Sequence, residues 1–156
     1  MVKLSPNVTD ITAVARAVES AGADSVSAVN TYVGMKIHRG IRAPVLGGRG
    51  TVGLSGPVIK SLALAAVAEV RAAVRIPVVG VGGIMNADDA LDFIIAGANA
   101  VQVGTATFVN PGAALEVLDG LRAAATRAEA TGLSGLRRPQ RAHSVPPAGI
   151  EPASTG

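Results

Sequence analysis

The sequence predicts an α/β fold, namely the C-terminal half of a (β/α)8 TIM barrel built from four βα units, with a disordered C-terminal tail. Three observations support this. Short apolar runs alternate four times with segments of helical periodicity. The apolar residues are mainly Ala and Val, a composition typical of buried parallel strands. The last two apolar runs both end in glycine junctions, where such barrels often hold a phosphate.

The first two units occupy the N-terminal half of the chain. We expect a strand at 2–4, then a helix over 9–21, where apolar residues recur at helical spacing. A second strand is expected at 25–29. A loop rich in Gly and Arg follows over 30–56, and a proline then opens a helix over 57–73, a position that proline favours.

The last two units follow directly. We expect strands at 76–81 and 98–103. Asn86 is a good N-cap for a helix over 87–96, and the two aspartates of its first turn suit the positive end of the helix dipole. A final helix is expected over 111–125. Four consecutive βα units predict a parallel sheet with right-handed crossovers.

Beyond residue 125 the pattern gives way to Arg, Pro, Ser and Gly, so we divide the chain into a partial barrel domain, 1–125, and a disordered tail, 126–156. From Arg122 onward there are five arginines and two glutamates, and this surplus of three equals the whole net charge of +3. The basic balance therefore belongs to the tail, and we expect no nucleic-acid-binding surface on the fold.

The chain has no cysteine, which excludes disulfides, a cysteine nucleophile and thiolate metal sites within it. His38 and His143 are isolated from other ligand-type residues, so we expect no metal. No apolar run reaches the ~18 residues of a membrane span. We expect a soluble, cytoplasmic protein without a membrane segment.

The glycine junctions are the strongest local signal of function. Gly82 and Gly83 follow the third strand, and Gly104 and Thr105 follow the fourth. Glycine lets backbone N–H groups approach phosphate oxygens closely, and the Thr105 hydroxyl adds another donor. A tight βα turn is the alternative explanation for either glycine junction alone. Two matched junctions on successive units favour a phosphate site.

Five ordered motifs, VKLSPNVTDI, AVNT, GLSGP, IPVVGVGGI and AVQVGTATF, resemble the C-terminal half of dihydroorotate dehydrogenase. The form with an NAD-linked partner subunit is the most similar, and the resemblance covers residues 2–121. A related flavin domain of dihydropyrimidine dehydrogenase shares part of the pattern and is the alternative. A nucleotide or thiamine synthase barrel would explain the glycine junctions but not KLSPNVTD, AVNT and GLSGP together.

The resemblance implies an FMN-dependent oxidoreductase of de novo pyrimidine synthesis that oxidises dihydroorotate to orotate. It places Asn30 and Thr31 on the pyrimidine substrate. It also implies the FMN-binding residues Lys3, Val29, Gly56, Gly82, Gly83, Gly104 and Thr105. Lys3 would contact the flavin ring, and the last four would hold the FMN phosphate.

One element of the family is absent. The resemblance implies a cysteine base in the first half of the barrel, so we expect no catalytic base here and no activity from this chain alone. The intact family enzyme passes electrons to a subunit that carries FAD and an iron–sulfur cluster and uses NAD. An open half-barrel exposes two strand edges, which favours self-association, and a non-catalytic phosphate-binding half-barrel remains the other hypothesis.

Overall fold

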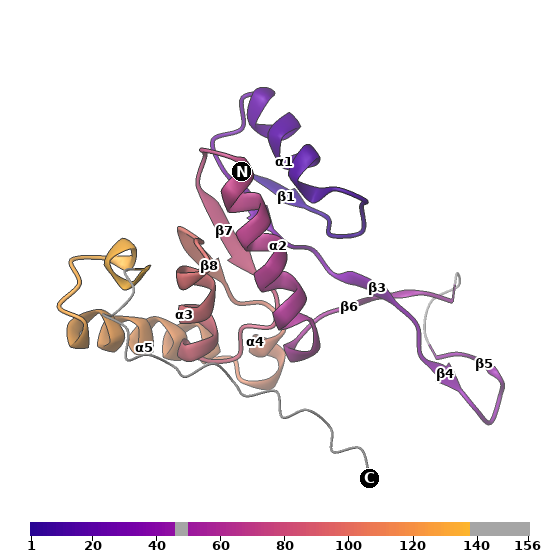
Figure 1. Ribbon diagram of the computed structural model, residues 1–156. Helices are drawn as coiled ribbons and strands as arrows, with labels where there is room; N and C mark the ends of the chain where they lie inside the picture. Colours follow the sequence, from indigo (N-terminus) through magenta and orange to yellow (C-terminus); the bar gives the residue numbers. More distant parts are fainter. Residues whose placement is uncertain (46–49, 138–156) are drawn as a thin grey trace, which may run out of the picture.

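The computed structural model describes residues 1–45 and 50–137 (Figure 1). Its core is a four-stranded sheet with the order β1-β2-β7-β8 in which every neighbouring pair is parallel. The strands are β1 (Val2–Leu4), β2 (Val26–Ala28), β7 (Val78–Val81) and β8 (Ala100–Gln102). The four predicted strands and their parallel arrangement are confirmed.

The predicted helices are also present. They are α1 (Ile11–Ser20), α2 (Lys60–Ala73), α3 (Ala87–Ile95) and α5 (Ala113–Arg127), with a short 3-10 helix, η1 (Pro57–Ile59), leading into α2. Two side-chain caps explain where α1 and α3 begin. Asp10 accepts hydrogen bonds from the backbone N–H groups of Thr12 and Ala13, and Asn86 accepts one from that of Asp89. The N-cap predicted at Asn86 is confirmed.

The hydrophobic core lies between the sheet and the helices. All of β2 is buried, and the largest fully buried side chains include Phe93, Leu4, Ile94, Val67 and Val70. Gly80 in β7 makes room for Phe93, because a Cβ at Gly80 would lie 2.7 Å from Phe93 Cδ1. The glycine is therefore a packing partner of Phe93, the only aromatic residue among the buried members of the described core cluster.

The segment 30–56 differs from the predicted loop. It contains two antiparallel ribbons, one pairing β3 (Tyr32–Gly34) with β6 (Val52–Leu54) and one pairing β4 (Ile37–His38) with β5 (Ala43–Pro44). The ribbons extend away from the sheet (Figure 1). The strands have two or three residues each, too few to give an alternating hydrophobic pattern. A four-residue helix, α4 (Ala106–Val109), was also not predicted.

The first residues of the predicted disordered tail are helical. Helix α5 continues past residue 125 to Arg127, and a second 3-10 helix, η2 (Leu133–Arg137), packs against α3 and α5. Leu133 contacts the core, and the Arg137 guanidinium donates a hydrogen bond to the Ala98 carbonyl. These contacts order a segment whose composition alone suggests disorder. The remainder of the predicted tail, 138–156, lies outside the described residues.

Within the ranges 1–45 and 50–137, none of the helices has the length and apolar character needed to cross a membrane.

Candidate active site at the strand ends

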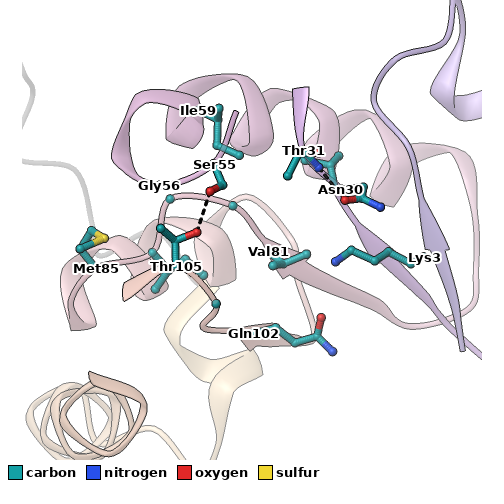
Figure 2. Close-up of a pocket in the computed structure, with 15 residues that line it drawn as sticks. Lys3, Asn30, Thr31, Ser55, Gly56, Ile59, Val81, Met85, Gln102 and Thr105 are labelled. Carbon is teal, nitrogen blue, oxygen red and sulfur yellow. Dashed lines mark hydrogen bonds between the residues drawn. The ribbon is translucent and has the colours of Figure 1, made fainter. Parts of the chain in front are cut away.

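One pocket lies at the carboxyl ends of the parallel strands (Figure 2). All nine residues predicted for cofactor or substrate binding line it: Lys3, Val29, Asn30, Thr31, Gly56, Gly82, Gly83, Gly104 and Thr105. They come from five separate regions of the chain, which the fold brings together. The pocket volume is about 130 Å³, below the ~300–1,000 Å³ of typical ligand pockets. The described residues therefore enclose only part of a cofactor-sized ligand.

The end of β2 is anchored on both sides. The Val29 N–H donates to the Val81 carbonyl at 2.9 Å, and the Asn30 N–H donates to the Leu4 carbonyl at 2.8 Å. The Asn30 carboxamide oxygen accepts the Thr31 N–H at 2.8 Å, while the side chain stays exposed. This contact fixes the carboxamide, and its NH₂ group has no bond within the described residues. Asn30 is thus a pre-oriented hydrogen-bond donor at the pocket.

Asn7 holds the backbone that follows Asn30. Its side-chain NH₂ donates to the Thr31 carbonyl at 2.8 Å, and its carboxamide oxygen accepts the Val33 N–H at 2.9 Å. Sequence reasoning missed Asn7, because nothing in the pattern relates positions 7 and 31. The KLSPN motif and the AVNT motif are therefore joined by a direct structural contact.

The Gly82-Gly83 turn requires glycine for its own geometry. Both residues have positive φ, +139° and +76°, where other residues are strained. A Cβ at Gly82 would lie 2.7 Å from Ala63 Cβ, and one at Gly83 would lie 2.9 Å from the Gly56 carbonyl oxygen. The tight βα turn, which was the alternative explanation for this junction, is therefore present, and the phosphate site stays a prediction.

Gly104 is different. A Cβ placed there would have no neighbour within 4 Å, and the residue is exposed. Neither packing nor a positive φ explains a glycine at this position. Close approach of a ligand to the backbone would explain it.

A hydrogen bond joins two loops around the pocket. The Thr105 hydroxyl donates to the Ser55 hydroxyl oxygen at 2.9 Å (Figure 2). Gly56, beside Ser55, has a φ of +81°, and a Cβ there would lie 3.5 Å from Thr105 Cγ2. The loop before η1 and the loop after β8 are therefore in contact, and both present hydroxyl groups to the pocket.

Cationic groups lie on two sides of the site. Lys3 points into the pocket from β1 (Figure 2). Behind the glycine turn, Lys60 forms ion pairs with Asp89 and Asp92 at 2.5 and 2.7 Å. The hydrogen bond to Asp89, followed by that to Asp92, raises the pKa of Lys60. Burial opposes ionisation of Asp89, but its hydrogen bonds from Lys60 and the Met85 N–H outweigh burial and lower its pKa.

Six pocket residues were not predicted: Ser55, Ile59, Val81, Ile84, Met85 and Gln102. Four of them lie inside the recognised motifs, close to predicted site residues, and this proximity could have indicated them as pocket residues: Ser55, Val81, Ile84 and Gln102. Ile59 belongs to a helical segment, where its apolar side chain gives no indication of a ligand.

The described residues contain no group of three or more metal-ligating side chains. His38 lies on β4, where Nδ1 accepts the Ile41 N–H, and His143 lies outside the described residues.

The family profile and the curated relatives that match this chain point to the same family. The profile of the family described as "Dihydroorotate dehydrogenase" matches residues 1–124. Three curated relatives are named "Dihydroorotate dehydrogenase B (NAD(+)), catalytic subunit". Those of Desulforamulus reducens and Trichlorobacter lovleyi are each 60% identical over 121 residues, and that of Lachnoclostridium phytofermentans is 53% identical over 121 residues. Each match covers 78% of this chain and 40% of the relative, so the chain spans about two fifths of their length.

Proposed function

This chain belongs to the dihydroorotate dehydrogenase family, and on that premise we propose that it forms the FMN- and substrate-binding part of an enzyme that oxidises (S)-dihydroorotate to orotate in de novo pyrimidine synthesis. The observation that carries the proposal is the convergence of all nine expected binding residues on one pocket at the strand ends. The four-stranded parallel sheet is compatible with the C-terminal half of a TIM barrel, which we propose as the complete architecture.

The phosphate of FMN would be held by Gly82, Gly83, Gly104 and Thr105. These residues fit the group, because all four line the pocket and the open space at Gly104 leaves the approach free. Backbone N–H groups bind phosphate oxygens by hydrogen bonding without needing a charged side chain. The Thr105 hydroxyl would add a donor once it turns from Ser55.

The isoalloxazine ring would lie against Val29 and Gly56, with Lys3 at its pyrimidine edge. When bound, FMN supplies an acceptor for the hydride that leaves the substrate. Lys3 places a positive charge where negative charge develops on the reduced ring, and such fixed charges lower the barrier when they are in place beforehand. Buried Val29, anchored to Val81, gives this side of the pocket a rigid apolar wall.

Asn30 and Thr31 would bind the pyrimidine ring. The Asn30 side chain is held by the Thr31 N–H, so its NH₂ group is oriented before the ligand arrives. A carboxamide and a hydroxyl offer the donors and acceptors that the ring amide and the carboxylate of dihydroorotate require. Asn7 would keep both residues in place through its bond to the Thr31 carbonyl.

Oxidation of dihydroorotate also removes a proton from the carbon next to the one that loses hydride, and a base must accept this proton. We propose that the base is a cysteine outside this chain, because the chain has no cysteine. We further propose a cytoplasmic protein that self-associates and transfers electrons to a partner subunit containing FAD and an iron–sulfur cluster and using NAD. The names of the relatives include the words "catalytic subunit", which supports the existence of a partner subunit.

The test uses ligands that separate this proposal from its alternative. The chain is loaded with FMN, and the flavin absorption spectrum is recorded while orotate or uracil is added. We expect orotate to perturb the spectrum at saturation, and the Asn30→Ala variant to keep FMN but lose the orotate response. A response to uracil and none to orotate would overturn the proposal in favour of a flavin domain similar to that of dihydropyrimidine dehydrogenase.

A further inference from the structure

A partly buried ion-pair network lies directly behind the glycine turn. Lys60, the first residue of α2, contacts Asp89 at 2.5 Å and Asp92 at 2.7 Å, both on α3. The side chains of Lys60 and Asp89 are 27% and 14% exposed, whereas that of Asp92 is 49% exposed. The Lys60–Asp89 pair is therefore the protected part of the network, and Asp92 is its solvated edge.

Asp89 uses its two carboxylate oxygens on two different elements. Oδ1 accepts from Lys60, and Oδ2 accepts the Met85 N–H at 2.9 Å. Met85 lies two residues after Gly83 and lines the pocket. The carboxylate thus connects the end of the glycine turn to the helix α3 and, through Lys60, to the helix α2.

Lys60 also contacts the turn itself. A Cβ at Gly83 would lie 2.8 Å from Lys60 Cβ and 3.0 Å from Lys60 Cα. The start of α2 therefore packs directly against Gly83, while Asp89 holds Met85 from the other side. Gly83 and Met85 are fixed by the two partners of a single ion pair.

The charges matter because the turn is the proposed phosphate site. An unpaired carboxylate near a bound phosphate would repel it, and the repulsion is stronger for partly buried groups than for solvated ones. Lys60 offsets the charge of Asp89 and is itself held by two carboxylates. Its role is consequently distinct from that of a lysine that binds phosphate directly.

We propose that Lys60 and Asp89 are positioning residues that hold the backbone of the Gly82–Met85 turn in the conformation that binds a phosphate group. The inference rests on the proposed function, since the turn that these two residues hold is part of the proposed FMN phosphate site. It assigns neither residue a contact with the ligand.

The first arm of the test compares FMN with riboflavin, which lacks the phosphate. Asp89→Asn is close in shape, but it replaces one of the two carboxylate oxygens by an NH₂ group, so either Lys60 or the Met85 N–H faces a donor in place of its acceptor. We expect this variant to bind FMN about tenfold more weakly, the size of effect that losing one charge-assisted hydrogen bond gives, with unchanged riboflavin affinity. Equal weakening for both flavins would overturn the proposal, because it would indicate a general loss of structure.

The second arm tests the charge balance. Lys60→Met leaves Asp89 uncompensated, so we expect weaker FMN binding, and the double variant Lys60→Met/Asp89→Asn should recover part of that loss. Asp92→Asn is the matched control in the same network, since Asp92 does not contact the turn. Additive losses in the double variant, or an effect of Asp92→Asn as large as that of Asp89→Asn, would contradict the proposal.

A third arm needs no flavin. Hydrogen exchange of the Met85 amide should be slow in the unmodified chain and accelerate in Asp89→Asn, with little change in the exchange of β7. If the unmodified chain binds no FMN while Met85 responds as expected, the proposed cofactor is wrong and the support of the turn stands. If the chain binds FMN but the Met85 amide and the FMN-to-riboflavin ratio do not change in Asp89→Asn, the positioning role is wrong and the cofactor stands.

Discussion

Thr105 donates a hydrogen bond from its hydroxyl to the Ser55 hydroxyl oxygen across 2.9 Å, which links two loops that are 50 residues apart in the chain (Figure 2). Ser55 accepts in this bond, so its own proton remains free to be donated. In this arrangement the Ser55 hydroxyl is the donor open to the pocket, while the Thr105 hydroxyl, the donor expected from the sequence, is engaged with Ser55.

We expect Thr105→Val to weaken FMN binding by about tenfold, because it removes a hydroxyl that would otherwise bind a charged group. Thr105→Ser keeps the hydroxyl and should bind FMN with near-normal affinity. Fluorescence titration of both variants measures the difference. Equal affinities for Val and Ser at this position would show that the hydroxyl takes no part.

A second prediction concerns the core below the site. Gly80→Ala should lower the free energy of unfolding by about 1–3 kcal/mol, because the new methyl group would overpack the space that Phe93 occupies. Replacing Phe93 by Leu in the same chain should recover part of this loss. Urea unfolding of the two single variants and the double variant gives the coupling, and strictly additive losses would be inconsistent with direct packing.

The pH dependence of stability follows from the Lys60–Asp89 pair. The pKa of Asp89 is lowered from 3.8, so its contribution is present above pH 3.8 and is lost as the pH falls through the lower value in the folded protein. The pKa of Lys60 is raised from 10.5, so its contribution is present below pH 10.5 and is lost as the pH rises through the higher folded value.

At neutral pH we expect Asp89→Asn to lower the free energy of unfolding by about 1.5–3 kcal/mol, as for other hydrogen bonds to charged groups. The difference from the unmodified chain should shrink on acidification, and urea unfolding across this range measures it. The exposed pair Arg122–Asp119 provides the control, since Asp119→Asn should change stability by less than about 1 kcal/mol. A difference for Asp89→Asn that does not depend on pH would contradict the assignment.

The parallel sheet could be predicted from the sequence because each strand is a short apolar run and a segment of helical periodicity comes after it along the chain. The ribbons in 30–56 could not be predicted. Strands β3 and β6 are far apart in the sequence, and each strand is only three residues long. Local pattern contains no information on such pairing. The helical segment after Ala125 was missed for a similar reason, since Leu133 and Arg137 are ordered by contacts with residues that are distant in the sequence.

The site was predictable to the extent that its residues belong to recognisable motifs. All nine expected residues line one pocket, because motifs that follow parallel strands converge at one edge of the sheet. The supporting residues Asn7, Lys60 and Asp89 were not predicted as parts of the site. Asn7 and Asp89 contact the backbone of the pocket loops, and Lys60 contacts the Asp89 carboxylate. None of these contacts follows from a motif in the sequence.

Turnover provides a further prediction. Dihydroorotate added to the FMN-loaded chain should leave the flavin oxidised, because the chain contains no cysteine to act as base. Flavin absorbance under anaerobic conditions measures this, with dithionite as the positive control for reduction. Rapid bleaching by dihydroorotate would show that a base is present within these 156 residues and would refute this part of the proposal.

We propose that the glycine junctions bind the phosphate of FMN, and Gly104 is the junction residue where a side chain can be added without a clash. A Cβ at Gly104 has no neighbour within 4 Å, and the same is true at Gly132, which lies away from the pocket. Gly104→Asp and Gly132→Asp are therefore matched variants that should both fold. In a fluorescence titration with FMN, we predict saturable binding by the unmodified chain and by Gly132→Asp, and a loss of at least about tenfold in Gly104→Asp from carboxylate–phosphate repulsion. Equal FMN affinity in the two variants would mean that the phosphate of FMN does not bind at Gly104.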